Sequence, residues 1–287
     1  MSYNLGFIGG GNMSTVIFRG ILKNDTHPAS KIWVSGPHLE NLTHWQEEGA
    51  NVTHNNEDVF KQCDVVFLGV KPGMLQEALR GVGDTLLRRL HDNPDLLVIS
   101  MLAGINLDSL RKAFQVLSPQ SQEINFIKFA RIMPNVPMAV GSGICLYSFN
   151  NLGENMRHKL VKLLQSCGTC EEVPENLMDS LGSLTACGPA YIFMVIEALA
   201  DGAVKQGVPR AMALRCAAQM VKGSASVVLE SKKHPAQLKD EVCSPGGSTI
   251  CGVSVLEEGK LRSTLINALE ASTNRTKKLD PKSGNSK

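Results

Sequence analysis

The sequence has almost no excess of charge of either sign. Lys and Arg total 29 and Asp and Glu total 27, which leaves a formal net charge of +2 over 287 residues. Nucleic acid and anionic membrane surfaces are recognised by concentrations of basic side chains, and this overall balance does not indicate one. We therefore expect neither nucleic acid nor a membrane as a partner.

The sequence also lacks a long apolar run. The apolar uncharged stretch at residues 181–196 contains Gly182, Gly188 and Pro189 and is shorter than the ~20 apolar residues that a membrane span needs. The first strand-like segment begins a few residues after Met1, where a secretory signal would need a basic region and an apolar one. We expect a soluble protein of the cytoplasm, with the mitochondrion as the alternative.

Cysteine is too sparse for a disulfide framework. Of eight irregularly spaced cysteines, only Cys167 and Cys170 form a CxxC pair. Such a pair can be redox-active or half of a zinc site, but no second pair completes a metal site, and a strand-like segment follows where a thioredoxin-type pair begins a helix. We favour a structural role. The seven histidines are scattered, and no metal is expected.

Short apolar runs alternate with amphipathic segments as far as about residue 173. The runs that predict strands are residues 4–10, 31–36, 64–70, 96–102, 129–134, 143–148 and 170–173, and helical stretches include 12–24, 74–90 and 154–165. This alternation predicts the α/β class, with a largely parallel sheet covered on both faces. The chain is long enough for about two domains. Residues 1–173 are predicted to form a doubly wound Rossmann domain.

After Pro174 the β-branched runs disappear and long helical segments follow. Residues 174–279 are predicted to form an all-helical domain, and residues 280–287 a polar tail. The segment 190–204 is apolar on nearly every face, so it must be buried in a core or a subunit interface. Glu197 and Asp201 on it could be a catalytic pair, but Lys205 continues their stripe and favours a solvated or paired helix edge.

The segment GFIGGGNMS, beginning at Gly6, predicts a nucleotide loop. It joins the first strand to the first helix and places Gly9 and Gly11 in the first two positions of G-x-G-x-x-G, with Ser14 in the third. Gly9 permits a tight turn, and Gly11 lets the backbone approach a pyrophosphate at the helix N-terminus. The predicted cofactor contacts are Ile8, Gly9, Gly10, Gly11, Asn12 and Met13.

The second strand ends without the acidic residue that usually binds the ribose of NAD. Ser35, and His38 after it, could instead meet a 2′-phosphate, so NADPH is the expected cofactor and NADH the alternative. Further strand ends should complete the crevice, because ligands of open α/β sheets lie at the carboxyl ends of strands. These are Val70, Lys71 and Pro72, then Ala103 and Gly104, then Met133, Pro134 and Asn135.

A second glycine loop lies late in the chain, in VCSPGGSTICG at residues 242–252. It precedes a helical pattern, so its free N–H groups form another anion site, with the hydroxyls of Ser244, Ser248 and Thr249 nearby. It has no lysine of the P-loop type, which suits a small carboxylate better than a triphosphate. The alternative is an ordinary helix cap after a Pro-Gly turn.

Residues 183–210 and 234–253, with GFIGGGNM, VKP and MPNVP in the first domain, resemble pyrroline-5-carboxylate reductases. The segment SCGTCEEVPE is closer to their animal cytosolic branch. The resemblance implies a Rossmann domain, a helical domain that forms an intertwined homodimer, and often a ring of dimers such as a decamer. It implies reduction of 1-pyrroline-5-carboxylate to L-proline, the last step of proline biosynthesis, with NAD(P)H as hydride donor.

The resemblance also implies site residues. Thr249 would hydrogen-bond the ring nitrogen as the catalytic hydroxyl, and the substrate-binding residues would be Glu175, Ser244, Gly246, Gly247, Ser248 and Thr249. Asn56 would contact the cofactor. Glu241 differs from the Asn of some relatives and is not assigned a role.

Ala186 and Cys187 depart from the Gly-Ser that is usual in the family before Gly188-Pro189. This departure motivates a second interpretation, an NADPH-binding regulator with weakened catalysis. A β-hydroxyacid-type dehydrogenase is a third, although it would call for a catalytic lysine in the second domain.

Overall fold

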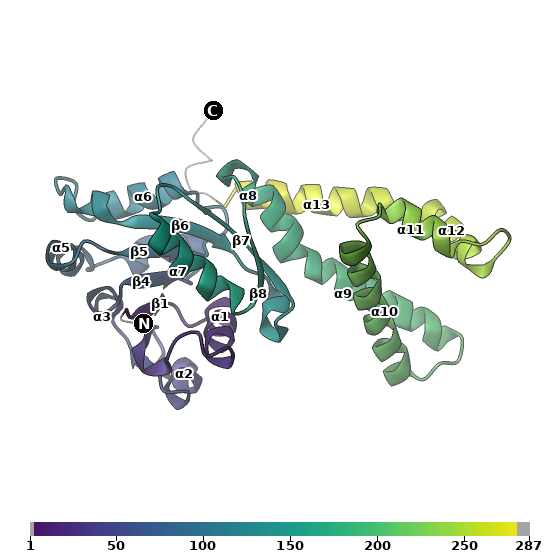
Figure 1. Cartoon of the computed structure of the whole chain (residues 1–287), viewed down its shortest axis with the longest axis horizontal. Helices are drawn as coiled ribbons and strands as arrows, with labels where there is room; N and C mark the ends of the chain where they lie inside the picture. Colours follow the sequence, from purple (N-terminus) through teal and green to yellow (C-terminus); the bar gives the residue numbers. More distant parts are fainter. Residues whose placement is uncertain (1–2, 280–287) are drawn as a thin grey trace. The chain divides into compact units, whose positions relative to one another are not determined.

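In the computed structural model, which describes residues 3–279, eight strands form one sheet (Figure 1). They are β1 Leu5–Ile8, β2 Ile32–Ser35, β3 Asn51–Thr53, β4 Val65–Leu68, β5 Leu97–Ser100, β6 Lys128–Met133, β7 Gly143–Phe149 and β8 Gly168–Glu172. The order is β3-β2-β1-β4-β5-β6-β7-β8, and only β6 and β7 pair antiparallel. The predicted doubly wound sheet is confirmed.

All seven predicted strands are present, and one strand was missed. β1, β4 and β5 are buried at every residue, as expected of parallel strands covered on both faces. The missed strand, β3, has three half-buried residues at the edge of the sheet. A strand this short and this polar gives no apolar run to recognise.

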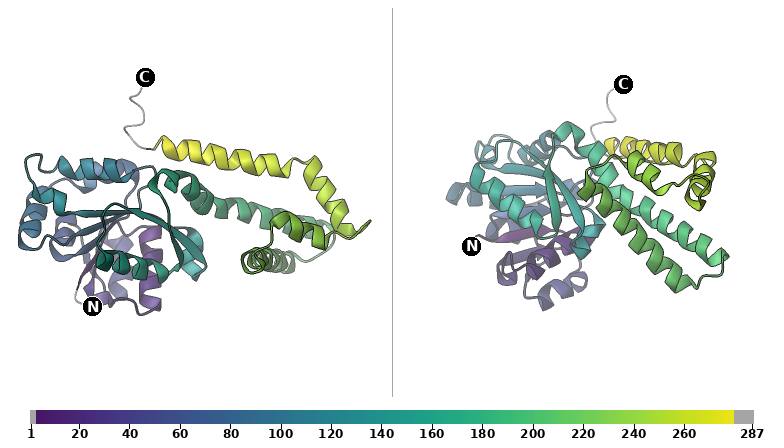
Figure 2. Two further views of the ribbon diagram at one scale, coloured as in Figure 1. Left: turned by 45° about the horizontal axis from the view of Figure 1, so that its top comes forward. Right: turned by 45° about the vertical axis from the view of Figure 1, so that its right-hand side comes forward.

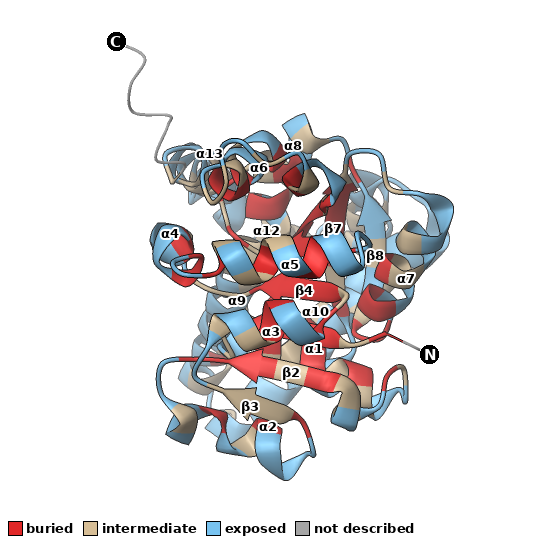
Figure 3. Cartoon of the chain, turned by 90° about the vertical axis from the view of Figure 1, so that its left-hand side faces the viewer, coloured by how far each residue is buried: buried red, intermediate tan, exposed pale blue. Residues whose placement is uncertain are grey.

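Helices cover both faces of the sheet. They are α1 Asn12–Lys23, α2 Thr43–Glu47, α3 Asn56–Gln62, α4 Leu75–Ala78, α5 Gly83–Asp92, α6 Leu107–Gln115, α7 Glu154–Gln165 and α8 Glu175–Gly182. The apolar sides of α1, α2 and α7 form one core with the sheet, and those of α3, α5 and α6 form another. Figure 3 shows buried strands between helices whose outer sides are exposed.

The predicted helical stretch 74–90 is wrong as a single helix. The chain forms a short turn of 3-10 helix at Pro72–Met74, then α4, and starts again as α5. Gly81 stands between them with a φ of +80°, in the left-handed region that ends a helix. Two glycines within three residues, Gly81 and Gly83, therefore outweigh the continuous amphipathic pattern.

By its contacts the chain divides into two compact units, the first up to Cys187 together with the described residues from Ser272 on, and the second Gly188–Ala271. This division differs from the predicted domain edge at residue 173, because α8 packs on the sheet. Met178 of α8 lies in an apolar cluster with Met133, Leu146 and Val173. Beside it, the Arg131 guanidinium of β6 forms an ion pair with Asp179.

The second unit is helical, as predicted: α9 Gly188–Lys205, α10 Arg210–Ser231, α11 Pro235–Val242, α12 Ser248–Glu258 and most of α13 Leu261–Lys277. Helices α9 and α10 lie side by side (Figure 2). Asp201 of α9 pairs with Arg210, which supports the paired helix edge over a catalytic carboxylate pair.

Very little of the second unit is buried within one copy of the chain. In this fully described unit the buried residues are three alanines, at 200, 213 and 217, packed between α9 and α10. Large exposed apolar side chains include Phe193, Met194, Met212, Met220, Leu229 and Ile266. The helical run Glu175–Lys205 is long and apolar enough to cross a membrane by length and composition alone, and 11% of an apolar 18-residue segment within it is buried. Apolar surface on this scale marks an interaction surface.

Substitution of Asp179 by Ala tests the link between α8 and the sheet. Arg131 is 1% exposed, so its charge would be left buried without a partner, and we expect the free energy of unfolding to fall by about 3 kcal/mol. Asp201→Ala is the control, because its pair with Arg210 is exposed and worth under about 1 kcal/mol. Urea unfolding at one fixed protein concentration measures both. Equal losses in the two variants would contradict the anchoring role.

Candidate functional site

The first helix begins with free backbone N–H groups at the predicted nucleotide loop. Gly9 has a φ of +95°, which makes the tight turn after β1. Gly11 caps α1 without any side-chain hydrogen bond, and a Cβ at this position would have no atom within 4 Å. The amides of the first turn of α1 therefore face an open, glycine-lined space, as a pyrophosphate requires.

Ser14 fits the loop because Gly69 makes room for it. The Ser14 hydroxyl is buried and donates to the Gly9 carbonyl at 2.6 Å. A Cβ on Gly69, which follows β4, would lie 2.1 Å from Ser14 Oγ. The serine at the third motif position is thus accommodated by a glycine on the neighbouring strand end.

The end of β2 is joined to Asn56 by hydrogen bonds. The Ser35 hydroxyl is fully buried and donates to Asn56 Oδ1 at 2.7 Å, while Asn56 Nδ2 donates to the Ala78 carbonyl at 2.8 Å. Ser35 therefore orients Asn56, and direct contact of its hydroxyl with a cofactor stays a prediction. His38 is exposed, with Nδ1 3.3 Å from a Glu40 carboxylate oxygen.

The other predicted cofactor residues lie at the same edge of the sheet. Val70, Lys71 and Pro72 follow β4, which pairs parallel with β1, and Ala103 and Gly104 follow β5, which pairs parallel with β4. Lys71 is exposed and has no partner in the part of the chain that the structure describes. Gly104 is buried with a φ of +79°. The edge combines one free cation with the free amides of α1.

Glu175 is held by the backbone of another helix. Its Oε1 accepts a hydrogen bond from the Leu107 N–H at 2.5 Å, at the start of α6. A carboxylate there satisfies a first-turn amide and complements the helix dipole. Its contact with a substrate stays a prediction.

The second glycine loop, in the second unit, has the geometry of an anion site. The Gly247 N–H donates to the Ser244 carbonyl at 3.0 Å across Pro245 and Gly246, and Gly246 has a φ of +69°. These are features of a type II turn. A Cβ on Gly247 would lie 2.4 Å from Ser244 Oγ, so a side chain there would displace the Ser244 hydroxyl.

Gly247 caps α12 without a side-chain hydrogen bond, which leaves the amides of Ser248 and Thr249 free. Both side chains are exposed, and within the described chain the Thr249 hydroxyl has no partner. Gly247 is itself the helix cap after a Pro-Gly turn, so the structure shows the cap, and the binding of an anion there stays a prediction. The loop presents free amides and a free hydroxyl.

Nearby groups are engaged in structural contacts. His234 Nδ1 accepts from the Ala236 N–H at 3.2 Å and caps α11. The Glu241 carboxylate is held by Lys233 Nζ at 2.8 Å, and this ion pair lowers the pKa of the carboxyl.

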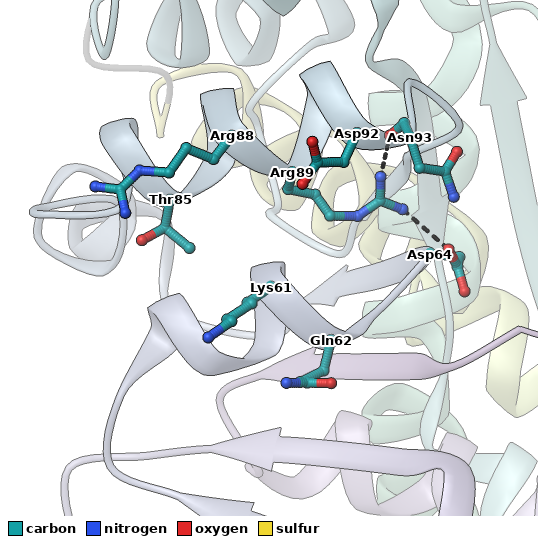
Figure 4. A pocket seen from close by; sticks show the side chains of 8 residues that line it. All are labelled: Lys61, Gln62, Asp64, Thr85, Arg88, Arg89, Asp92 and Asn93. Atoms are coloured by element: carbon teal, nitrogen blue, oxygen red, sulfur yellow. Dashed lines mark hydrogen bonds and ion pairs between the residues drawn. The ribbon is translucent and has the colours of Figure 1, made fainter.

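A pocket of about 520 Å³ lies at the opposite edge of the sheet (Figure 4). Its Arg89 side chain donates to Asp64 at 2.9 Å and to the carbonyls of Asn93, Asp95 and Cys63, so it ties α5 to the strand starts. The amino ends of β4 and β5 meet here, away from the glycine loop. Arg89 is therefore a structural cation of this pocket.

The CxxC pair lies in a partly buried environment. Burial raises the pKa of the Cys167 and Cys170 thiols, which keeps them protonated and favours the structural interpretation of this pair. Over residues 3–279 no three His, Cys, Asp or Glu side chains are grouped to hold a metal ion.

Comparisons with known proteins cover most of the chain. A family model described as pyrroline-5-carboxylate reductase dimerisation matches residues 175–279, and one described as NADP oxidoreductase coenzyme F420-dependent matches residues 4–104. The chain is 39% identical to pyrroline-5-carboxylate reductase 2 of Rattus norvegicus, over 96% of this chain and 83% of that protein.

Two solved structures are also similar. One is Plasmodium falciparum pyrroline carboxylate reductase with NADP bound, with a TM-score of 0.83, 30% identity, and 97% of this chain and 98% of that chain covered. The other is pyrroline-5-carboxylate reductase of Coxiella burnetii, with a TM-score of 0.81, 31% identity, and coverage of 97% and 99%.

Substitution of Gly11 by Ala tests the nucleotide loop. The added methyl contacts no protein atom but enters the space in front of the α1 amides, so we expect the dissociation constant for NADPH to rise at least about tenfold. Gly153→Ala is the matched control, since Gly153 also caps a helix and also faces open space. Fluorescence titration with NADPH measures both. A similar affinity in both variants would remove the α1 N-terminus from the cofactor site.

Proposed function

Because the chain belongs to the pyrroline-5-carboxylate reductase family, we propose that it reduces the cyclic imine 1-pyrroline-5-carboxylate to L-proline. The observation that carries the proposal is a second helix N-terminus, that of α12, with free amides, two glycines and a free Thr249 hydroxyl. A small carboxylate with an adjacent ring nitrogen matches this donor set, and a triphosphate does not.

The first glycine loop fits the cofactor. Gly9 and Gly11 leave space for a pyrophosphate, and the free amides of α1 face that space. When bound, NADPH supplies the hydride. NADPH is favoured over NADH because β2 ends in Ser35 and no carboxylate stands there to repel a 2′-phosphate, and the similar Plasmodium structure was solved with NADP.

The second loop fits the substrate. The free amides of Ser248 and Thr249 hold the carboxylate through charge-assisted hydrogen bonds. Thr249 Oγ1 accepts a hydrogen bond from the protonated ring nitrogen and so keeps the proton there, which leaves the imine carbon electron-poor. A pyrrolinium is already electrophilic, so orientation can supply much of the rate without an acid or base side chain.

The apolar surface of the second unit fits a second copy of this chain. One subunit buries little more than three alanines there and exposes Phe193 and Met194 of α9. The family model that covers this region is a dimerisation model. We propose a homodimer with the apolar run of α9 in its interface, and a decamer built from five such dimers.

We also propose a cytoplasmic location, from the resemblance of residues 166–175 to the cytosolic branch.

Substitution of Thr249 by Ala tests the mechanism. Loss of a hydrogen bond to a charged group costs about 1.5–3 kcal/mol, so kcat/KM should fall by about 10- to 100-fold. Thr249→Ser retains the hydroxyl and should remain within about threefold of the parent. The measurement is NADPH oxidation with pyrroline-5-carboxylate. Full activity of the alanine variant would remove Thr249 from the mechanism, and an inactive parent that binds NADPH would favour the regulator.

Substitution of Phe193 by Asp tests the interface. A charge in an apolar interface costs several kcal/mol, so we expect the dissociation constant of the dimer to rise at least about 100-fold in the variant. Val116→Asp is the control, because Val116 is an isolated exposed apolar side chain in the first unit, 68% exposed. Analytical ultracentrifugation measures the mass of each variant. A monomeric parent, or an unchanged assembly of the Phe193 variant, would contradict the proposal, and a parent mass other than ten subunits would exclude the decamer.

A further inference from the structure

The helical run from α8 to α9 contains one turn of π-helix, Ser183–Cys187. Such turns are rare, occur mostly as single bulges inside α-helices and are frequent at functional sites. Pro189 follows two residues later. Since proline has no N–H, the carbonyl four residues before it, that of Thr185, loses its α-helical donor. Pro189 therefore explains why the helix is irregular at this turn.

A side chain from the sheet replaces the missing donor. Asn135 Nδ2 donates to the Thr185 carbonyl at 3.1 Å, and Asn135 Oδ1 accepts from the Ile144 N–H at 3.1 Å. Asn135 lies two residues after the end of β6 and is 6% exposed. A buried amide that makes both bonds connects the π-turn to β6 and β7 in a single orientation.

The π-turn also contacts the edge of the sheet that carries the predicted cofactor residues. Ala186 of the turn and Ala103, which follows β5, pack against the same apolar cluster of Met133, Leu146, Val173 and Met178. Asn135 itself lies at the carboxyl end of β6, next to β5. A displaced π-turn would therefore change the surroundings of Ala103.

We propose that Asn135 is a positioning residue for this reductase: its side-chain amide replaces the donor that Pro189 lacks and so holds the π-turn Ser183–Cys187 beside Ala103. The assignment to the reaction rests on the proposed function. Asn135 acts through the π-turn rather than by touching substrate or cofactor. Its replacement should therefore lower kcat by a larger factor than it raises the KM for NADPH.

The test uses Asn135→Asp in the full-length protein. The aspartate keeps the acceptor for the Ile144 N–H but turns an oxygen toward the Thr185 carbonyl, so we expect kcat to fall about tenfold. Asn51→Asp is the matched control: Asn51 Nδ2 also donates to backbone carbonyls, those of Ser30 and Ile32, but at the far edge of the sheet. Equal losses in the two variants would overturn the proposal.

Two further measurements distinguish positioning from a general loss of structure. Pro189→Ala supplies the missing N–H, so adding it to Asn135→Asp should recover most of the lost kcat. Burial beside the Thr185 carbonyl should raise the pKa of the introduced carboxyl, so lowering the pH from 8 to 5.5 should protonate more of it and let it donate again, and the ratio of variant to parent kcat should rise. Absence of both recoveries, or a raised KM for NADPH with unchanged kcat, would overturn the proposal.

Hydrogen exchange separates this inference from the proposed function. The amides of residues 183–188 should lose protection in Asn135→Asp and regain it in the double variant with Pro189→Ala, whatever the substrate. If the parent reduces no pyrroline-5-carboxylate but exchange changes in this way, the proposed reaction is wrong and the role of Asn135 in holding the π-turn is supported. If the parent is active and exchange is unchanged, the role of Asn135 is wrong and the proposed reaction is supported.

Discussion

The close approach of α1 to the ends of β1 and β4 is the constraint on which the cofactor edge depends. Gly9 turns the chain, Gly69 leaves room for Ser14, and Gly11 leaves the first-turn amides of α1 open. A side chain at Gly9 or Gly69 would meet backbone or side-chain atoms at 3.1 Å or less. Because the helix dipole and the free amides act over only one turn, this contact decides whether an anion can bind.

In the second unit the helices make too few apolar contacts with one another to bury their large apolar side chains. Its helices bury only small alanines against one another and leave large apolar side chains in solvent. Hydrophobic burial is the main favourable contribution to folding, so a unit of this composition needs a further surface to cover it. The apolar helix α9 is consistent with a subunit interface, and the same composition explains why it passes a membrane-span criterion of length and hydropathy.

Departures from regular structure lie near proposed functional segments. The π-turn before Pro189 is stabilised by Asn135, and the type II turn before α12 depends on Gly246. Each costs backbone regularity, and each is compensated by a specific donor or by a glycine. Hydrophobic periodicity predicts regular helices and strands, but it does not predict the contacts that interrupt them at such positions.

Much of the fold followed from local pattern. Seven of the strands were predicted from apolar runs, because strands of a parallel sheet that is covered on both faces are continuously apolar. The helix at residues 154–165 was also predicted correctly. Stretch 74–90 was wrong as one helix, since the conformation of Gly81 overrides periodicity. Strand β3 was missed because its stability comes from pairing with β2 rather than from its own composition.

For the site, the sequence by itself determined both glycine loops, because the need for glycine at a turn and for uncapped amides at a helix start is local. Tertiary structure alone decided the roles of Ser35, Glu175 and Asn135. Ser35 donates to Asn56, Glu175 accepts from the backbone of α6, and Asn135 donates to Thr185 across 50 positions of the chain. No periodicity encodes such partners, because each hydrogen bond depends on where the folded chain brings two distant groups within about 3 Å.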